Sequence, residues 1–175
     1  ALPRNADALN WSRLLNGWDR RMRIVQAAVA AAPSATPACL RVRDANVHKH
    51  AHNLGGGSLV DPKWHGTNDW HNPSTHPCHH VPVTTIDEVV RRNAASCPVV
   101  VKMDIEGYEH FALKGATALL SRAPPCAIFL EFHVPLLKAS GAGPPLDMIK
   151  ILQRRGYVLK SHSYAHISAA IEMNS

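Results

Sequence analysis

The stretch PVVVKMDIEGYE, residues 98–109, determines the fold class that this sequence predicts. Residues 98–103 form an apolar run rich in β-branched side chains, which is typical of a central parallel strand buried on both faces. A turn with three carboxylates and a glycine follows, and residues 109–121 then show the apolar spacing of an amphipathic helix. The stretch therefore predicts strand, turn and helix in the order of an α/β fold.

The same alternation continues towards the C-terminus. Residues 126–132 form a second apolar run that predicts a buried strand, and residues 144–155 have the pattern of a helix with Pro145 in its first turn. Gly156 marks the end of that helix, and residues 157–160 predict a further strand. We expect an open, mostly parallel sheet flanked by helices.

Upstream, the pattern is weaker but of the same kind. Residues 5–16 predict a helix, and residues 22–29 and 39–42 predict short strands. Thr85 and Glu88 have the spacing of a capping box, so a helix is expected through residue 93. Between these parts, residues 47–82 are rich in His, Gly and Pro and predict an insertion or lid, because so long a loop is unusual in a compact domain.

Composition limits the classes of partner. The net charge is +6 and the sequence pI is about 9.4, yet the basic residues fall in small groups without interleaved aromatic residues. We expect these groups to be solvated helix ends and predict no nucleic-acid partner. No run is long and apolar enough to predict a membrane segment. The four cysteines lack paired spacing and predict reduced, mostly buried thiols.

Polar side chains end two of the predicted strands. Asp104 and Glu106 follow the first strand, and Glu131 and His133 lie at the end of the next one. Ligands of open parallel sheets bind beyond the carboxyl ends of the strands. We therefore predict that these four side chains share one rim and include the catalytic residues.

Each of these acids also has a structural interpretation. Glu109 is interpreted as a helix cap, which contributes about 0.3–1 kcal/mol. Asp104 is interpreted as functional, because a carboxylate leaving a buried strand is costly unless a partner satisfies it. For Glu106 both interpretations stay open. Lys102 is expected to pair with a neighbouring acid, and His133 is interpreted as a core or rim histidine before a catalytic one.

These residues carry a resemblance to a known family. Residues 102–109 read K-x-D-x-E-G-x-E, residues 113–116 read L-K-G-A, and a later strand ends in Glu131. This series resembles the FkbM-like methyltransferases, which use S-adenosylmethionine. Thr85-Ile86-Asp87 resembles a T-L-D element of that family, and weaker similarity extends to residues 53–59 and 3–29.

The resemblance implies a Rossmann-like class I methyltransferase sheet and O-methylation of a hydroxyl on a sugar or natural product. It implies a small-molecule or glycan acceptor, and it assigns Asp104 and Ala28 to the cofactor. The glycine-rich cofactor loop has no counterpart here, and Leu2 stands where the family usually has Glu. The chain also opens without an initiating Met. We therefore expect residues 1–175 to be a single partial domain, truncated on its N-terminal side and cut from a longer protein. The oligomeric state is left open.

Two other functions compete with this one. The cluster His76, Cys78, His79 and His80 contains zinc or copper ligands, although its spacing fits no standard site. A metal site is therefore the weaker hypothesis. The second alternative is an inactive methyltransferase fold that serves as an interaction module, which the absence of the cofactor loop favours.

Overall fold

The computed structural model describes residues 2–42, 57–58, 78–93, 100–163 and 167–173. In this part of the chain the elements follow in the order α1 (Pro3–Leu15), β1 (Ala28–Val29), β2 (Ser34–Val42), β3 (Gly57–Ser58), β4 (Cys78–Thr84), α2 (Ile86–Asn93), β5 (Val100–Met103), α3 (Glu109–Lys114), α4 (Thr117–Arg122), β6 (Ala127–Glu131), α5 (Val134–Ala139), α6 (Pro145–Gln153), β7 (Tyr157–Ser163) and β8 (Ile167–Met173). The fold is mixed α/β.

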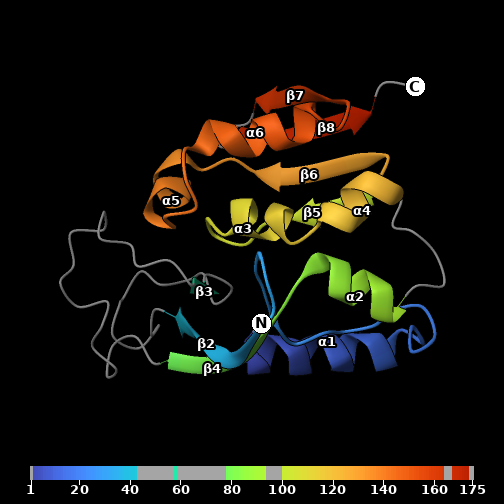
Figure 1. Ribbon diagram of the computed structural model, residues 1–175. Coiled ribbons are helices and arrows are strands. Elements are labelled where there is room, and N and C mark those ends of the chain that lie inside the picture. Colours follow the sequence, from blue (N-terminus) through green and yellow to red (C-terminus); the bar gives the residue numbers. More distant parts are fainter. Residues whose placement is uncertain (1, 43–56, 59–77, 94–99, 164–166, 174–175) are drawn as a thin grey trace.

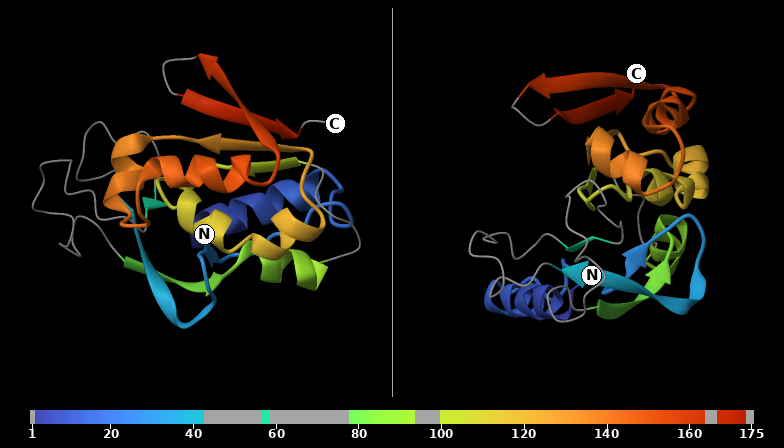
Figure 2. Two further views of the ribbon diagram at one scale, coloured as in Figure 1. Left: turned by 45° about the horizontal axis from the view of Figure 1, so that its top comes forward. Right: turned by 90° about the vertical axis from the view of Figure 1, so that its left-hand side faces the viewer.

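The strands form two small sheets. The first has the order β1-β4-β2-β3 and the second has the order β5-β6-β8-β7. In Figure 1 the first sheet lies in the lower part of the molecule with α1 and α2, and the second lies in the upper part with α3 to α6. The right-hand view of Figure 2 also shows these two parts one above the other. Each sheet therefore has its own set of helices.

Each sheet contains one parallel pair. β1 runs parallel to β4, and β5 runs parallel to β6 with Met103 opposite Leu130. The other pairs among the described strands are antiparallel. The expected parallel neighbours β5 and β6 are thus present, with α3 and α4 as the connection between them, but the sheets are not mostly parallel. β7 and β8 form an antiparallel hairpin that adds to the far side of β6.

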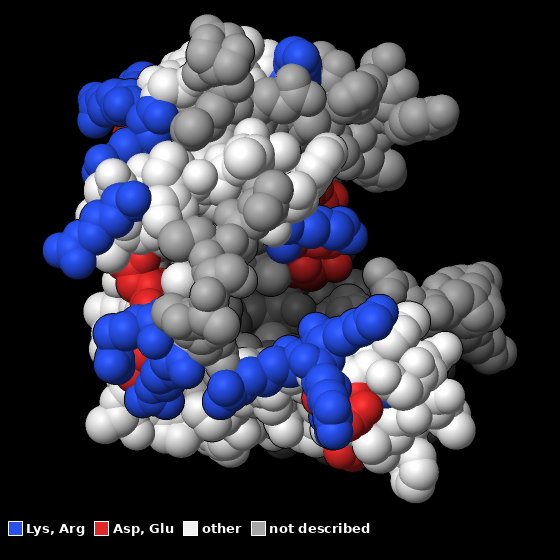
Figure 3. All heavy atoms as spheres, turned by 90° about the vertical axis from the view of Figure 1, so that its right-hand side faces the viewer, with Lys and Arg blue, Asp and Glu red and all other residues white. Residues whose placement is uncertain are grey.

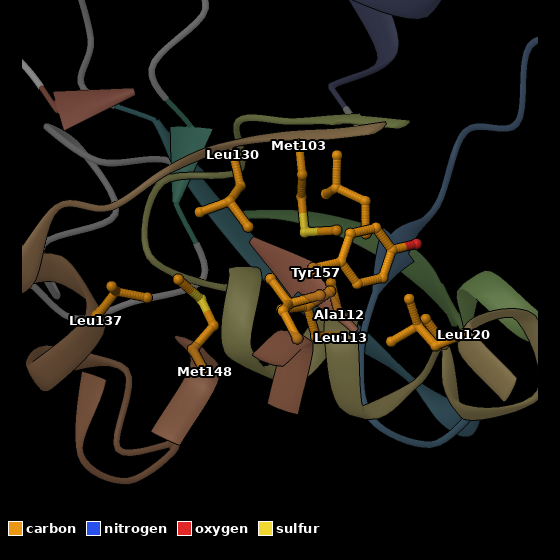
Figure 4. Close-up of a cluster of buried hydrophobic side chains, with 11 residues drawn as sticks. Met103, Ala112, Leu113, Leu120, Leu130, Leu137, Met148 and Tyr157 are labelled. Atoms are coloured by element: carbon orange, nitrogen blue, oxygen red, sulfur yellow. The ribbon is translucent and has the colours of Figure 1, made fainter. Parts of the chain in front are cut away.

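The main hydrophobic core lies between the second sheet and its helices. Met103 of β5 and Leu130 of β6 point towards Ala112 and Leu113 of α3 (Figure 4). Tyr157 is also buried here, and its hydroxyl donates a hydrogen bond of 2.7 Å to the carbonyl oxygen of Pro125. A smaller core in the first sheet consists of Leu2, Ala28, Leu40 and Val81. The ends of β5 and β6 are therefore supported by the larger core.

Several sequence-based predictions of elements need correction. Val100 of β5 is 54% exposed and Phe129 of β6 is 44% exposed, so these strands are not buried on both faces. The helix predicted at residues 109–121 is divided into α3 and α4 at Gly115. The strand predicted at residues 22–29 is only β1, the two residues Ala28–Val29. α5 and β8 were not predicted.

The predicted insertion at residues 47–82 is only partly described. Its last residues, from Cys78 onwards, belong to β4, the strand that β1 and β2 flank in the first sheet. Gly57–Ser58 forms β3. The other residues of the range lie outside the described part of the chain. No helix within the described ranges has the length and apolar character that crossing a bilayer requires.

The cysteine prediction is wrong for Cys39 and Cys78 and is confirmed only in part for Cys126. Cys39 of β2 and Cys78 of β4 form a disulfide across the two strands, with a Cα–Cα distance of 5.4 Å. Cys126 is a free thiol but is exposed rather than buried. Cys97 lies outside the described residues. No spacing pattern predicts this disulfide, because the two cysteines are 39 residues apart and meet through the pairing of β2 with β4.

Candidate active site

The carboxyl ends of β5 and β6 bring the predicted acids together. The parallel register places Met103 opposite Leu130, so the next residues along each strand, Asp104 and Glu131, lie at the same edge of the sheet. Glu106 follows in the turn that leads to α3. Its carboxyl is close enough to Glu131 and Asp104 for both charges to raise its pKa. The sequence-based grouping of these three carboxylates is therefore supported by the geometry.

Glu106 has an unusual backbone conformation. Its φ is +56°, and it is the only non-glycine residue of the described part with a positive φ. A left-handed conformation costs an L-residue about 1–2 kcal/mol, and such strained residues cluster at functional sites. The pKa of Glu106 is raised above its ordinary value of 4.5, first by burial and then by the charges of Glu131, Asp104 and Glu109. The chain thus holds a half-buried carboxyl in a strained turn beside other acids.

Asp104 is the more exposed member of the group. Its side chain is 52% exposed, and its Oδ2 lies 3.4 Å from Nζ of Lys102. This pair confirms the prediction that Lys102 contacts a neighbouring acid. Because both side chains are largely solvated, the ion pair contributes little to stability. The Asp104 carboxylate therefore remains available to a ligand at the sheet edge.

Glu109 organises the turn from inside. It is the first residue of α3, its side chain is only 1% exposed, and its Oε1 accepts a hydrogen bond of 2.9 Å from the backbone N–H of Ile105. Burial raises the pKa of Glu109, while hydrogen bonds from the N–H groups of Ile105, Glu109 and Gly107 act in the opposite direction. Glu109 is therefore structural, but it binds the turn before α3 and is not the predicted cap, because Tyr108 is the N-cap residue and no side-chain cap is present. Its carboxylate is also much more deeply buried than the sequence indicates.

The same turn packs closely against α5. Gly107 has a φ of +94°, and a Cβ at this position would lie 2.8 Å from Cβ of Leu136 and 2.9 Å from its carbonyl oxygen. Only glycine fits there. His133 occupies the N-cap position of α5, where its side chain makes no capping hydrogen bond, and it is partly buried. It follows the end of β6 by two residues, as predicted. The turn and α5 are therefore held as one unit next to the acids.

Two predicted site residues are placed elsewhere. Ala28 lies in β1 of the other sheet, where it is buried with Leu2, Leu40 and Val81, and it does not join the acids of β5 and β6. Among the metal candidates, Cys78 is bonded to Cys39 and cannot act as a thiolate ligand, and His76 lies outside the described residues. His79 and His80 are consecutive in β4 and so point to opposite faces. Within the described residues no group of three metal-ligating side chains exists.

Some residues near the turn were missed by sequence reasoning. Asp87 of α2 accepts hydrogen bonds of 2.8 Å at both carboxylate oxygens, from the backbone N–H groups of Ala118 and Leu119 in α4. It therefore caps a helix that begins 30 residues further along the chain. His110 of α3 is 2% exposed, and burial lowers its pKa. Neither role has a local signal, because both depend on packing between distant segments.

Comparison with known proteins assigns the chain to a family. Residues 20–159 match the methyltransferase FkbM domain. The chain belongs to the FkbM methyltransferase family. The match covers Asp104, Glu106 and Glu131, the turn that precedes α3, and the contact between α2 and α4. Neither the curated proteins nor the solved structures contain a match to this chain.

The FkbM methyltransferase motifs have separate physical roles in this chain. In the L-K-G-A motif, Gly115 ends α3 where a Cβ would overlap the carbonyl oxygen of Ala30. In the T-x-D motif, Thr85 accepts a hydrogen bond of 3.0 Å from the N–H of Glu88, which confirms half of the predicted capping box. The Glu88 side chain instead accepts a hydrogen bond of 3.1 Å from the hydroxyl of Thr84. These two motifs position the halves of the domain, and K-x-D-x-E-G-x-E carries the acids.

Proposed function

We propose that this chain carries the acceptor side of an S-adenosylmethionine-dependent O-methyltransferase. The observation that supports this most directly is Glu106, a half-buried carboxyl in a left-handed turn beside Asp104 and Glu131. A raised pKa makes a carboxylate a better proton acceptor near neutral pH. The proposed acceptor is a hydroxyl of a sugar or a natural product.

The roles of the acids follow from the charges in methyl transfer. When bound, S-adenosylmethionine supplies an electrophilic methyl group on a positively charged sulfonium. The carboxylates at the ends of β5 and β6 fit a cationic ligand, and the exposed Asp104 is the one placed to face it. As the acceptor oxygen forms its bond to the methyl carbon, the bond from that carbon to sulfur breaks and its electron pair stays on the sulfur. The acceptor oxygen loses its proton, and we assign that proton to the carboxylate of Glu106. Burial and then the charge of Glu131 raise the pKa of Glu106, and His133 is the alternative proton acceptor.

The proposed fold is part of a Rossmann-like sheet. β5, the α3–α4 connection and β6 form a strand–helix–strand unit with parallel neighbouring strands, which is the repeating unit of such sheets. The acids follow the carboxyl ends of this pair, where ligands of open α/β sheets bind.

The test separates cofactor binding from methyl transfer. Calorimetric titration with S-adenosylmethionine and its demethylated product measures binding, and transfer of an isotopically labelled methyl group to a panel of hydroxylated acceptors measures turnover. We expect Glu106→Gln to lower kcat by about 10²–10⁴-fold with little change in cofactor affinity, because general base catalysis contributes about that much. Asp104→Asn should abolish turnover and weaken cofactor binding.

Asp7→Asn is the matched control, because Asp7 is an exposed acid of α1 and lies far from Asp104 and Glu106 in the sequence. It should leave both quantities unchanged. Unchanged turnover in Asp104→Asn would remove Asp104 from the active site. A folded protein that binds neither form of the cofactor would overturn the proposal that residues 1–175 act as an enzyme by themselves, and would favour an interaction module or a partial domain.

A further inference from the structure

A hollow lies at the end of α1, in the part of the molecule that contains the first sheet. It has a volume of about 410 Å³ and is formed by the last turn of α1 and the segment that follows. Its lining includes four arginines and one acid, Arg13, Asp19, Arg20, Arg21 and Arg23. The space has the size that small-molecule sites occupy.

The charges around this hollow are not balanced by the protein. Four arginines against Asp19 leave three net positive charges, since guanidinium stays protonated at any ordinary pH. Within the described ranges, Arg20, Arg21 and Arg23 take part in no ion pair with an acid. In Figure 3, Lys and Arg side chains gather across the lower half of the face shown. The end of α1, the segment after it and α2 lie on this side of the molecule in Figure 1. Bringing like charges together costs free energy that an anionic ligand would offset.

Arg13 shows that part of the site is already organised. Its Nη1 donates a hydrogen bond of 3.3 Å to the backbone carbonyl oxygen of Asp19, which fixes the guanidinium at the wall of the hollow. Its Nε is buried and has no hydrogen-bond partner within the described residues. A buried donor without a partner costs about 1–3 kcal/mol unless a ligand or water accepts its hydrogen bond. The planar fork of arginine matches phosphate oxygens in two-point contacts.

From these observations we infer that the hollow at the end of α1 is a binding site for the phosphate or pyrophosphate group of a small molecule. The inference does not depend on the proposed methyltransferase activity, because it uses none of the acids of β5 and β6. The inference adds a role to Arg20, Arg21 and Arg23, which are exposed as expected of a solvated helix end. The other arginine groups also fit that expectation: Arg91 and Arg92 lie in the last turn of α2, and Arg154 and Arg155 follow α6.

The experiment uses inorganic pyrophosphate as the probe. Its affinity for the 175-residue chain is measured by calorimetric titration at low salt, for the unchanged chain, Arg20→Gln/Arg21→Gln and Arg154→Gln/Arg155→Gln. The two double variants remove the same charge from exposed adjacent arginines. We expect saturable binding to the unchanged chain. The Kd should rise about tenfold or more in Arg20→Gln/Arg21→Gln, because hydrogen bonds to charged groups are lost. The Kd should rise much less in the control, Arg154→Gln/Arg155→Gln.

A second arm distinguishes a soluble ligand from a lipid headgroup. Vesicles of phosphatidylcholine with and without phosphatidic acid are tested for co-sedimentation with the same three proteins. Binding to phosphatidic acid vesicles alone, lost only in Arg20→Gln/Arg21→Gln, would support the phosphate site with a lipid as its source. Equal losses in the two double variants would show general charge attraction and overturn the inference. Absence of binding in both arms, with all three proteins folded by circular dichroism, would overturn it as well.

Discussion

At the scale of single residues, Glu106 combines two unfavourable features in one position. Its backbone is left-handed, and its carboxylate is half-buried next to other acids. The raised pKa means that the folded protein binds this proton more tightly than the unfolded chain does. The stability linked to Glu106 is therefore fully present below its ordinary pKa of 4.5 and is lost as the pH rises through the higher pKa of the folded state.

Replacing Glu106 should stabilise the protein at neutral pH. We expect Glu106→Gln to increase the free energy of unfolding at pH 7. In the unchanged protein this free energy falls in part through Glu106 as the pH rises above 4.5, and the variant should lose that part of the fall because the amide carries no charge. Glu106→Gly should stabilise further, by about 1 kcal/mol, because glycine adopts a positive φ without steric cost. Urea unfolding measured from pH 4 to pH 8 tests both variants. Lower stability at pH 7 in Glu106→Gln would show that the carboxylate makes favourable contacts in the fold and is not under strain.

The sequence predicted the grouping of Asp104, Glu106 and Glu131 but not the state of Glu106. The apolar runs show where each strand ends, and two parallel neighbouring strands end at the same edge of a sheet. These two facts together predict that the three carboxylates lie close to one another. The left-handed turn depends instead on α5, because Leu136 leaves no space for a side chain at Gly107. That contact joins segments 29 residues apart and has no pattern in the sequence.

At the scale of elements, the short helices depend on contacts with other elements. α4 has six residues, and Ala116 at its N-cap provides no side-chain cap. Asp87 from α2 fills that role by accepting hydrogen bonds from the N–H groups of Ala118 and Leu119. A helix of this length is not stable alone. The position of α4 therefore depends on α2.

Removing this cap should measurably destabilise the fold. We expect Asp87→Ala to lower the free energy of unfolding by about 1–2 kcal/mol, the range found for the loss of a helix N-cap. Asp87→Asn should cost less, because one amide oxygen can still accept a hydrogen bond. Chemical unfolding against Asp7→Ala, which removes an exposed acid from α1, provides the comparison. Equal stability of Asp87→Ala and Asp7→Ala would mean that the two hydrogen bonds contribute nothing net.

The elements that the sequence predicted are those with strong periodicity of their own. α1, α2 and α6 were predicted close to their observed bounds, and β5, β6 and β7 fall within or next to apolar runs. The sequence places most of β4 in the insertion predicted at residues 47–82, because the segment Cys78-His79-His80 has no apolar alternation. This segment is a strand because it pairs with β2. α3 and α4 read as one helix, since the close approach of Gly115 to Ala30 is not visible in the amphipathic pattern.

At the scale of the whole molecule, the two sheets with their helices meet at a joint formed by Gly115, Ala30, Thr85 and Asp87. Gly115, between α3 and α4, belongs to the upper part in Figure 1, while Ala30, Thr85 and Asp87 belong to the lower part. The carbonyl oxygen of Gly115 accepts a hydrogen bond of 3.0 Å from the N–H of Asp87. A Cβ at Gly115 would overlap the carbonyl oxygen of Ala30 and lie 3.2 Å from Cβ of Thr85. The two parts therefore meet at Gly115 through close backbone contacts that require glycine, in addition to the packing of Val29 and Ile86 against the larger core.

This arrangement makes Gly115→Ala a test of how the molecule is assembled. Alanine is the better helix former by about 1 kcal/mol, and the φ of Gly115 is −82°, so local conformation alone predicts stabilisation. We expect a loss of about 1–3 kcal/mol instead, because the added methyl group must push the two parts away from each other. Gly17→Ala is the control for a glycine in open space, and its cost should come only from its positive φ.

A double-mutant cycle then distinguishes a shared joint from two separate defects. Gly115→Ala pushes the α3–α4 segment away from α2, so it also weakens the hydrogen bonds from the N–H groups of Ala118 and Leu119 that Asp87→Ala removes. The double variant should therefore lose less stability than the two single losses added together, by about 0.5 kcal/mol or more, as is usual for residues in direct contact. Urea unfolding of the four proteins gives this coupling. Strict additivity would show that Gly115 and Asp87 act independently, and that the two sheets are connected through contacts other than this joint.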